Sequence, residues 1–132
     1  MAIPFRNVSS GRYRPLYLSL VSSDDEGITV NGIKAVSTGA IFAEWLLVGL
    51  FYRPGMTPEQ VLYFFIRADH PGLTIVGRKG VAPGAPTKDQ PLSGIGDEID
   101  SFQYFDSVKI PWSQVVHIGN IDHAKEYPQR IF

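Results

Sequence analysis

The stretch that decides the fold reads DEIDSFQYFDSVKIPWSQVV and covers residues 97–116. Its middle part, from Ser101 to Ile110, is rich in the aromatic and β-branched residues that strands favour. Strict alternation assigns two faces: Phe102, Tyr104, Asp106, Val108 and Ile110 on one, and Ser101, Gln103, Phe105, Ser107 and Lys109 on the other. Because Pro111 cannot donate to a sheet ladder, we expect the strand to end there, with Trp112 packed over the end of the sheet.

Turn residues divide the rest of the chain into short apolar segments. Strands are predicted at residues 16–22, 28–30, 33–37, 45–53, 61–67 and 73–78. The Asn31-Gly32 pair between β-branched residues predicts a two-residue hairpin turn, since such turns need positive φ angles. The near-continuous apolar run over residues 45–53 predicts a strand buried on both faces. Residues 38–44 are expected to form a compact loop or one helical turn, and Pro58 is expected to open another.

These segments together predict an all-β protein. We expect a six- to eight-stranded antiparallel barrel, closed or nearly closed, with a short C-terminal helix. A single domain would span residues 1–132, with 1–15 an irregular lead-in and 121–132 a helical tail. Closure would also protect the edges of the apolar strands. Residues 79–93 contain three prolines and no periodicity, which is typical of a long functional or mobile loop.

Composition excludes several classes of function. Lys and Arg number 12 against 13 Asp and Glu, a formal net charge of −1, which gives no electrostatic case for nucleic acid. The absence of Cys excludes disulfides, thiolate catalysis and iron–sulfur clusters. The longest apolar run is too short to span a bilayer and no secretory leader is visible, so a cytoplasmic protein is expected. The three histidines, His70, His117 and His123, lack metal-ligand spacing, so no metal site is predicted.

Several blocks of the sequence resemble one family. Residues 104–112 resemble the Phe-Asp-x-Val-x-x-Pro-Trp signature of the oxygenase component of 4-hydroxyphenylacetate 3-monooxygenases. Residues 27–40 resemble that family's Gly-x-x-Val-x-Gly-x-Lys-x-x-x-Thr-Gly-Ala segment, and residues 63–78, 91–100 and 119–125 resemble further blocks in the same order. The resemblance implies the middle β-barrel domain of a flavoprotein that shares its architecture with acyl-CoA dehydrogenases.

The resemblance also implies a cofactor site. In the family this domain covers one side of the flavin ring, so Thr38 is expected to contact FAD or FMN, with the backbone of Gly39 and Ala40 as helpers. The helical domains that complete the family's flavin site have no counterpart in this sequence. We therefore expect the isolated chain to bind flavin weakly or not at all.

The loop before the deciding stretch is expected to border the substrate pocket, again by resemblance. This assigns Ser93, Gly94 and Asp97 as substrate-binding residues. The carboxylates of Asp97, Glu98 and Asp100 could serve acid–base chemistry, but solvated loop charges are the favoured interpretation. No catalytic residue is assigned.

Two functions from different classes follow. The chain is expected to be the β-barrel part of a reduced-flavin-dependent aromatic monooxygenase, without hydroxylase activity alone. Its partners would be a small aromatic molecule, a helical partner chain and a flavin reductase. The alternative is a free-standing, flavin-free barrel, complete as it stands, that binds a small apolar metabolite or catalyses a cofactor-independent cyclisation in secondary metabolism. Self-association of exposed apolar surface into a homodimer is a third option.

Overall fold

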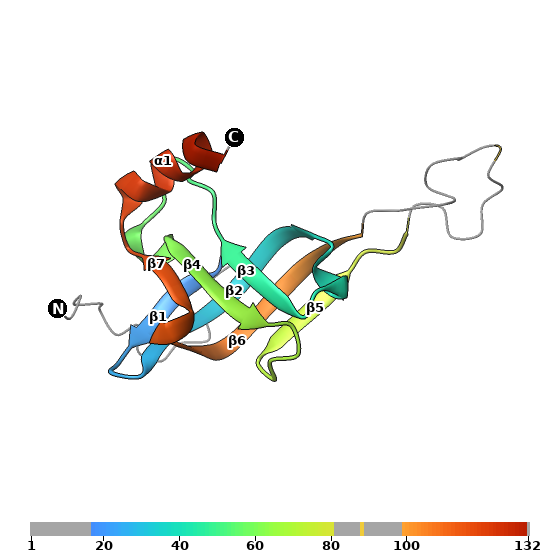
Figure 1. Cartoon of the computed structure of the whole chain (residues 1–132), viewed down its shortest axis with the longest axis horizontal. Helices are drawn as coiled ribbons and strands as arrows, with labels where there is room; N and C mark the ends of the chain where they lie inside the picture. Colours follow the sequence, from blue (N-terminus) through green and yellow to red (C-terminus); the bar gives the residue numbers. More distant parts are fainter. Residues whose placement is uncertain (1–16, 81–87, 89–98, 132) are drawn as a thin grey trace.

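The computed structural model describes residues 17–80, 88 and 99–131, and these form two antiparallel sheets (Figure 1). The larger sheet has the order β1 (Ser19–Ser23), β2 (Gly27–Thr38), β6 (Asp100–Pro111) and β5 (Leu73–Gly77). The smaller sheet has the order β3 (Trp45–Gly49), β4 (Leu62–Arg67) and β7 (Val115–Ile118). Three short 3-10 turns and one α-helix complete this part: η1 (Ala40–Phe42), η2 (Pro58–Gln60), η3 (Trp112–Gln114) and α1 (Ile121–Ile131).

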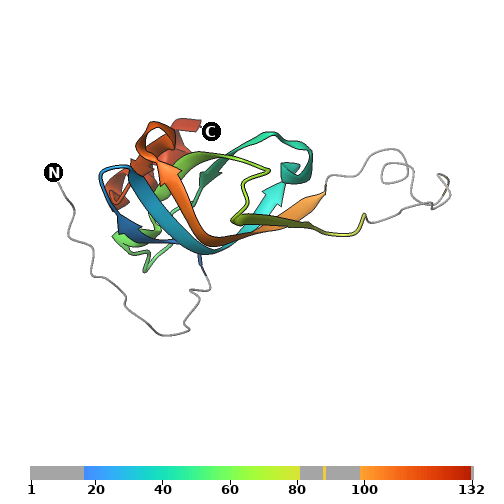
Figure 2. The same ribbon diagram turned by 90° about the horizontal axis from the view of Figure 1, so that it is seen from below.

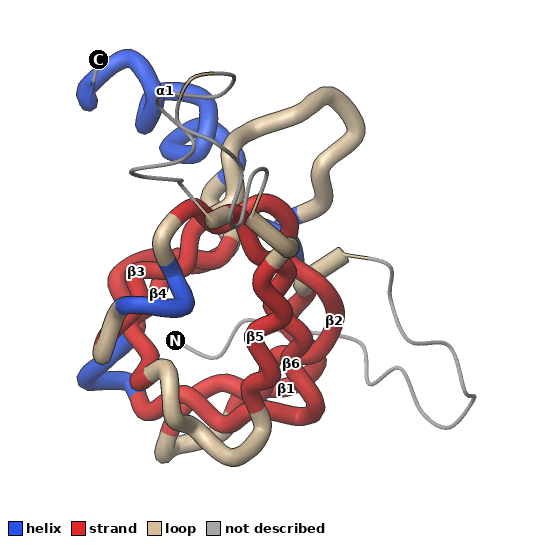
Figure 3. Tube along the Cα trace, turned by 90° about the vertical axis from the view of Figure 1, so that its right-hand side faces the viewer, coloured by secondary structure: helices blue, strands red, loops and turns tan. Residues whose placement is uncertain are grey.

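The all-β prediction with a short C-terminal helix is confirmed, but the closed barrel is not. Within the described residues the strands form two separate hydrogen-bonded sheets that wrap around a common interior (Figure 3). Strand β1 pairs with β2 as far as Asn31, and one further backbone bond runs from the N–H of Leu18 to the carbonyl oxygen of Ile33. Beyond that point β2 has β6 on one side, while its other edge faces a cavity shared with the segment after β3. The predicted lead-in, residues 1–15, lies outside the described residues.

Strand β2 continues through Asn31-Gly32, so the hairpin predicted there is wrong. Instead β2 and β6 lie side by side as two long curved strands (Figure 2), and their register shifts between Val30 and Gly32. Gly32 has a φ of 121°, and a Cβ at this position would lie 2.3 Å from the carbonyl oxygen of Tyr17. The Asn-Gly pair therefore serves a bulge where another backbone segment passes close by, not a turn.

The actual hairpin turn lies at Asp24, between β1 and β2. Its Oδ1 accepts hydrogen bonds from the backbone N–H groups of Glu26 (3.0 Å) and Gly27 (3.1 Å). Lys109 of β6 forms an ion pair with the Asp24 carboxylate; this bond holds the pKa of Asp24 below its ordinary value and raises the pKa of Lys109. The indole Nε1 of Trp112 donates to the Asp24 carbonyl oxygen (2.9 Å), which ties the end of β6 to this turn.

The faces predicted for β6 are only half right. Its buried residues have odd numbers up to Phe105 and even numbers from Val108 on. The phase changes at Ser107, which has a φ of 53° and lies where the register with β2 shifts. A bulge inserts one extra residue and so inverts the alternation beyond it. Phe102 and Tyr104, predicted to share a face with Val108, are therefore exposed at 47% and 41% on the outer surface.

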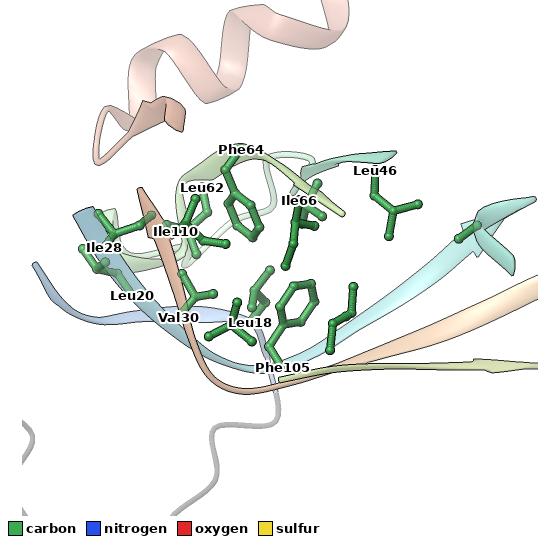
Figure 4. Packing of buried hydrophobic residues seen from close by; sticks show 14 residues of the cluster. Leu18, Leu20, Ile28, Val30, Leu46, Leu62, Phe64, Ile66, Phe105 and Ile110 are labelled. Atoms are coloured by element: carbon green, nitrogen blue, oxygen red, sulfur yellow. The ribbon is translucent and has the colours of Figure 1, made fainter. Parts of the chain in front are cut away.

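The core fills the space between the two sheets. Phe64 of β4 and Phe105 of β6 point toward each other across it, with ring centroids 5.9 Å apart in an edge-to-face arrangement (Figure 4). Aliphatic side chains from both sheets surround this pair: Leu18, Leu20, Ile28, Val30, Leu46, Val48, Leu62, Ile66, Leu73, Val108 and Ile110. The prediction that β3 is buried on both faces is wrong, because Trp45 and Leu47 are about half exposed on the outer surface.

Helix α1 lies beside one end of the smaller sheet (Figure 1). Asn120 starts it, since its Oδ1 accepts from the N–H groups of Asp122 (3.0 Å) and His123 (3.1 Å). Within the helix, Asp122 pairs with Lys125. A second small cluster holds the helix against the sheet: Met56, Val61, Tyr63 and Ala124. Across the described residues, no helix has the length and apolar character needed to cross a membrane.

Candidate functional site

The predicted cofactor contact lies where β2, η1 and β6 meet, here called the Thr38 corner (Thr38–Phe42 and Asp100). The hydroxyl of Thr38 donates to Oδ1 of Asp100 at 2.6 Å. The N–H of Gly39 donates to the carbonyl oxygen of Ile99 at 3.0 Å. Both bonds join the last residue of β2 and the turn after it to the beginning of β6.

Gly39 and Ala40 have separate roles in shaping this corner. Gly39 adopts the left-handed conformation (φ 72°, ψ 0°), and no atom lies within 4 Å of where a Cβ would stand. The position therefore needs glycine for its backbone angle, not for space. Ala40 is buried and begins η1, the helical turn expected in residues 38–44. Phe42, at the end of η1, is 73% exposed and presents an apolar ring to solvent.

Hydrogen bonding limits what the Thr38 hydroxyl can do. Its proton goes to Asp100, and the other carboxylate oxygen of Asp100 lies 3.9 Å from Nε of Arg78. The hydroxyl oxygen keeps lone pairs that can accept a further hydrogen bond from solvent or a ligand. A flavin ring has N–H groups on its polar edge, so Thr38 fits a flavin as an acceptor. To donate to a flavin carbonyl, the Thr38 hydroxyl would first have to break its hydrogen bond to Asp100.

The remaining predicted site residues are not tested by the structure. Ser93, Gly94 and Asp97 lie outside the described residues, and so does Glu98. Sequence reasoning missed the role of Asp100, which was interpreted as a solvated charge. The signal that identifies its role is the register of β2 and β6, which places Thr38 opposite Asp100. That register spans 62 residues of sequence, so no local pattern reveals it.

A groove of about 320 Å³ lies between the smaller sheet and α1. Leu47, Phe65 and Val116 form its apolar floor, and His117 and His123, whose ring centroids are 5.0 Å apart, lie at its side. Within the described residues, no group of three or more His, Cys, Asp or Glu side chains could hold a metal ion.

Comparisons with known proteins give the chain its family. It is 52% identical over 116 residues to the oxygenase component of 4-nitrophenol 4-monooxygenase/4-nitrocatechol 2-monooxygenase of Rhodococcus opacus, covering 87% of this chain and 22% of the relative. It is 46% identical over 127 residues to an FADH(2)-dependent monooxygenase, TftD, of Burkholderia cepacia, covering 96% of this chain and 24% of the relative.

A solved structure matches as well. This is the oxygenase component of 4-hydroxyphenylacetate 3-monooxygenase complexed with FAD and 4-hydroxyphenylacetate, with a TM-score of 0.73 and 26% identity. The match covers 96% of this chain and 26% of that one. By its fold, the chain thus corresponds to about a quarter of an oxygenase component.

The chain belongs to the 4-hydroxyphenylacetate 3-hydroxylase N-terminal family, whose profile matches residues 6–117. The family predicted from the sequence blocks is therefore confirmed. The chain spans only about a quarter of the length of the curated relatives described above.

Proposed function

We propose that the chain forms one wall of the flavin site in a reduced-flavin-dependent aromatic monooxygenase. The observation that carries the proposal is the Thr38 corner, where an exposed hydroxyl that is hydrogen-bonded to Asp100 can accept a further bond, in a chain whose family includes a structure with bound FAD. The names of the two relatives, a nitrophenol monooxygenase and an FADH(2)-dependent monooxygenase, agree with this chemistry.

When bound, reduced flavin would supply the two electrons with which one oxygen atom of O₂ enters the aromatic ring and the other leaves as water. The residues of this chain would orient the ring and exclude water from it. Thr38 would accept a hydrogen bond from a ring N–H, and Asp100 would hold the hydroxyl in place. The backbone of Gly39 and Ala40 would allow the ring to approach, because the turn there projects no side chain from Gly39.

The rest of the reaction would depend on other components. We propose that further polypeptide of the same oxygenase completes the flavin site, that a separate reductase supplies reduced flavin, and that the substrate is a phenol. Ser93, Gly94 and Asp97 remain our candidates for contact with that phenol. The alternative of a flavin-free barrel that binds a metabolite or catalyses a cyclisation finds no support in the relatives described above.

The first test concerns flavin binding by the 132-residue chain itself. We expect a dissociation constant for FAD or FMN above about 100 μM. A single corner offers a few hydrogen bonds of roughly 0.5–1.5 kcal/mol each, while association costs at least several kcal/mol in lost freedom. Titration followed by flavin fluorescence and by calorimetry measures this, with a full-length relative as the positive control. A protein that is yellow as purified, or a submicromolar dissociation constant, would contradict the proposal that the chain supplies only one wall.

A further inference from the structure

A cavity of about 410 Å³ lies between the second half of β2 and the segment that follows β3. We call it the seam cavity; the residues that matter here are Tyr17, Lys34, Val36, Leu50, Phe51 and Arg53. Among the described residues, the last backbone bond on this edge of β2 joins the N–H of Leu18 to the carbonyl oxygen of Ile33, and the edge beyond Ile33 has no described partner strand. The volume of the seam cavity falls within the range of small-molecule sites, roughly 300–1,000 Å³.

The charges around the seam cavity have one sign. Lys34 and Arg53 contribute two cations, and none of the described residues that line the cavity is acidic. The Arg53 guanidinium lies over the ring of Tyr17, with Cζ 3.9 Å from the ring centroid, and forms no ion pair with any described residue. By contrast, Arg67, Lys109 and Lys125 all have carboxylate partners.

Two hydrogen bonds to other residues of β2 hold the Lys34 ammonium in place and leave it a third donor. Its Nζ donates to the carbonyl oxygen of Val36 (3.2 Å) and to Oγ of Ser37 (3.0 Å). An ammonium has three donors, so one remains for a ligand. The side chain is half-buried, and this burial lowers the pKa of the Lys34 ammonium below its ordinary value. A charge that is partly removed from water without a counter-charge is unfavourable, and a bound anion would offset that cost.

We propose that the seam cavity binds a small ligand that joins an anionic head to an apolar, aromatic body. Arg53 and Lys34 bind the head, and Arg53 offers a two-donor fork that suits a carboxylate or a sulfonate. Leu50 and Phe51 pack against the body, together with Val36. The proposal does not depend on a flavin site, because none of the residues of the Thr38 corner lines this cavity.

Two dyes that differ by one sulfonate group test whether binding in the seam cavity requires an anionic head. Anilinonaphthalene sulfonate carries the anionic head, and N-phenylnaphthylamine has the same rings without it. We expect Arg53→Gln and Lys34→Met each to weaken binding of the sulfonate about tenfold, the effect of one charge-assisted hydrogen bond. Binding of the neutral dye should change less than about twofold. Fluorescence titration of the 132-residue chain measures all affinities, and circular dichroism checks that each variant is folded.

Matched controls separate the seam cavity from the rest of the surface. Arg67→Gln removes a guanidinium that also stacks on an aromatic ring, with its Cζ 5.8 Å from the Trp45 centroid, but that lies on the outer face and pairs with Asp69. Lys125→Met removes an ammonium that pairs with Asp122. Both controls should bind the sulfonate as the unaltered chain does.

Amide NMR shifts locate the bound dye. The sulfonate should move the amide signals of Val36, Gly49 and Phe51, and leave those of Val116 and His117 in the groove beside α1 unchanged. Three results would overturn the proposal: sulfonate affinity unchanged in Arg53→Gln, an equal loss for both dyes in that variant, or shifts confined to the groove. The backbone carbonyl of Arg53 accepts a hydrogen bond from Met56 that does not need the side chain, and the guanidinium itself only stacks on Tyr17. The Arg53→Gln variant therefore tests the proposal even if Lys34→Met fails to fold.

Discussion

Replacing Phe64 by alanine is expected to lower the free energy of unfolding by about 3–5 kcal/mol. The side chain is fully buried between the two sheets, and its ring meets that of Phe105 edge to face at 5.9 Å. Truncation removes this ring pair and leaves a cavity that strands on both sides cannot close without moving. Urea unfolding followed by circular dichroism measures the loss.

The neighbouring residue provides the control. Phe65 has the same side chain, but it points to the outer surface and is 43% exposed. Phe65→Ala should cost about 1 kcal/mol. Equal losses for the two variants would show that the assignment of inner and outer faces on β4 is wrong.

Gly32→Ala is expected to destabilise the fold by about 3 kcal/mol or more. Two effects add at this position. Its φ of 121° lies where residues with a Cβ rarely stay, and the new methyl would lie 2.3 Å from the carbonyl oxygen and 2.7 Å from the carbonyl carbon of Tyr17. Both atoms belong to backbone, so β2 and the segment that leads into β1 would have to separate. Thermal and urea unfolding measure the loss.

Gly55→Ala separates the energetic cost of the backbone conformation from that of a steric clash. Gly55 also has a positive φ, 80°, but nothing lies within 4 Å of its Cβ position. This variant should lose only about 1–2 kcal/mol, the cost of the left-handed conformation. If Gly32→Ala were no worse than Gly55→Ala, the close approach of Tyr17 to β2 would be contradicted.

Local patterns predicted the elements better than their arrangement. Single turns at η1 and η2 and the strands β4 and β5 were predicted because each depends on a few adjacent residues. The hairpin predicted at Asn31-Gly32 is wrong because a positive φ occurs in bulges as well as in turns. Only the nearby backbone of Tyr17 distinguishes the two structures. The short strand β7 was missed because its pairing with β4 is not visible in its own composition.

Local patterns also reveal only part of the candidate sites, because some of their residues come together through the pairing of distant strands. Thr38 could be selected from the sequence because a contiguous motif carries it. Asp100 could not, because it reaches Thr38 only through the register of β2 with β6. Lys34 and Arg53 likewise belong to different segments, and they share a cavity only because the two sheets do not close.

The most direct test of the proposed function is the rate at which a chimera hydroxylates 4-nitrophenol. In the chimera, the matching 116 residues of the Rhodococcus opacus oxygenase component are replaced by those of this chain. Supplied with reduced FAD and oxygen, the chimera should act within about tenfold of its parent's rate, a difference of ~1.4 kcal/mol in the barrier. Thr38→Val in the chimera should weaken FAD binding, since the acceptor is lost. A chimera that folds and assembles like its parent but neither binds FAD nor forms product would contradict the claim that this chain is one wall of a flavin site.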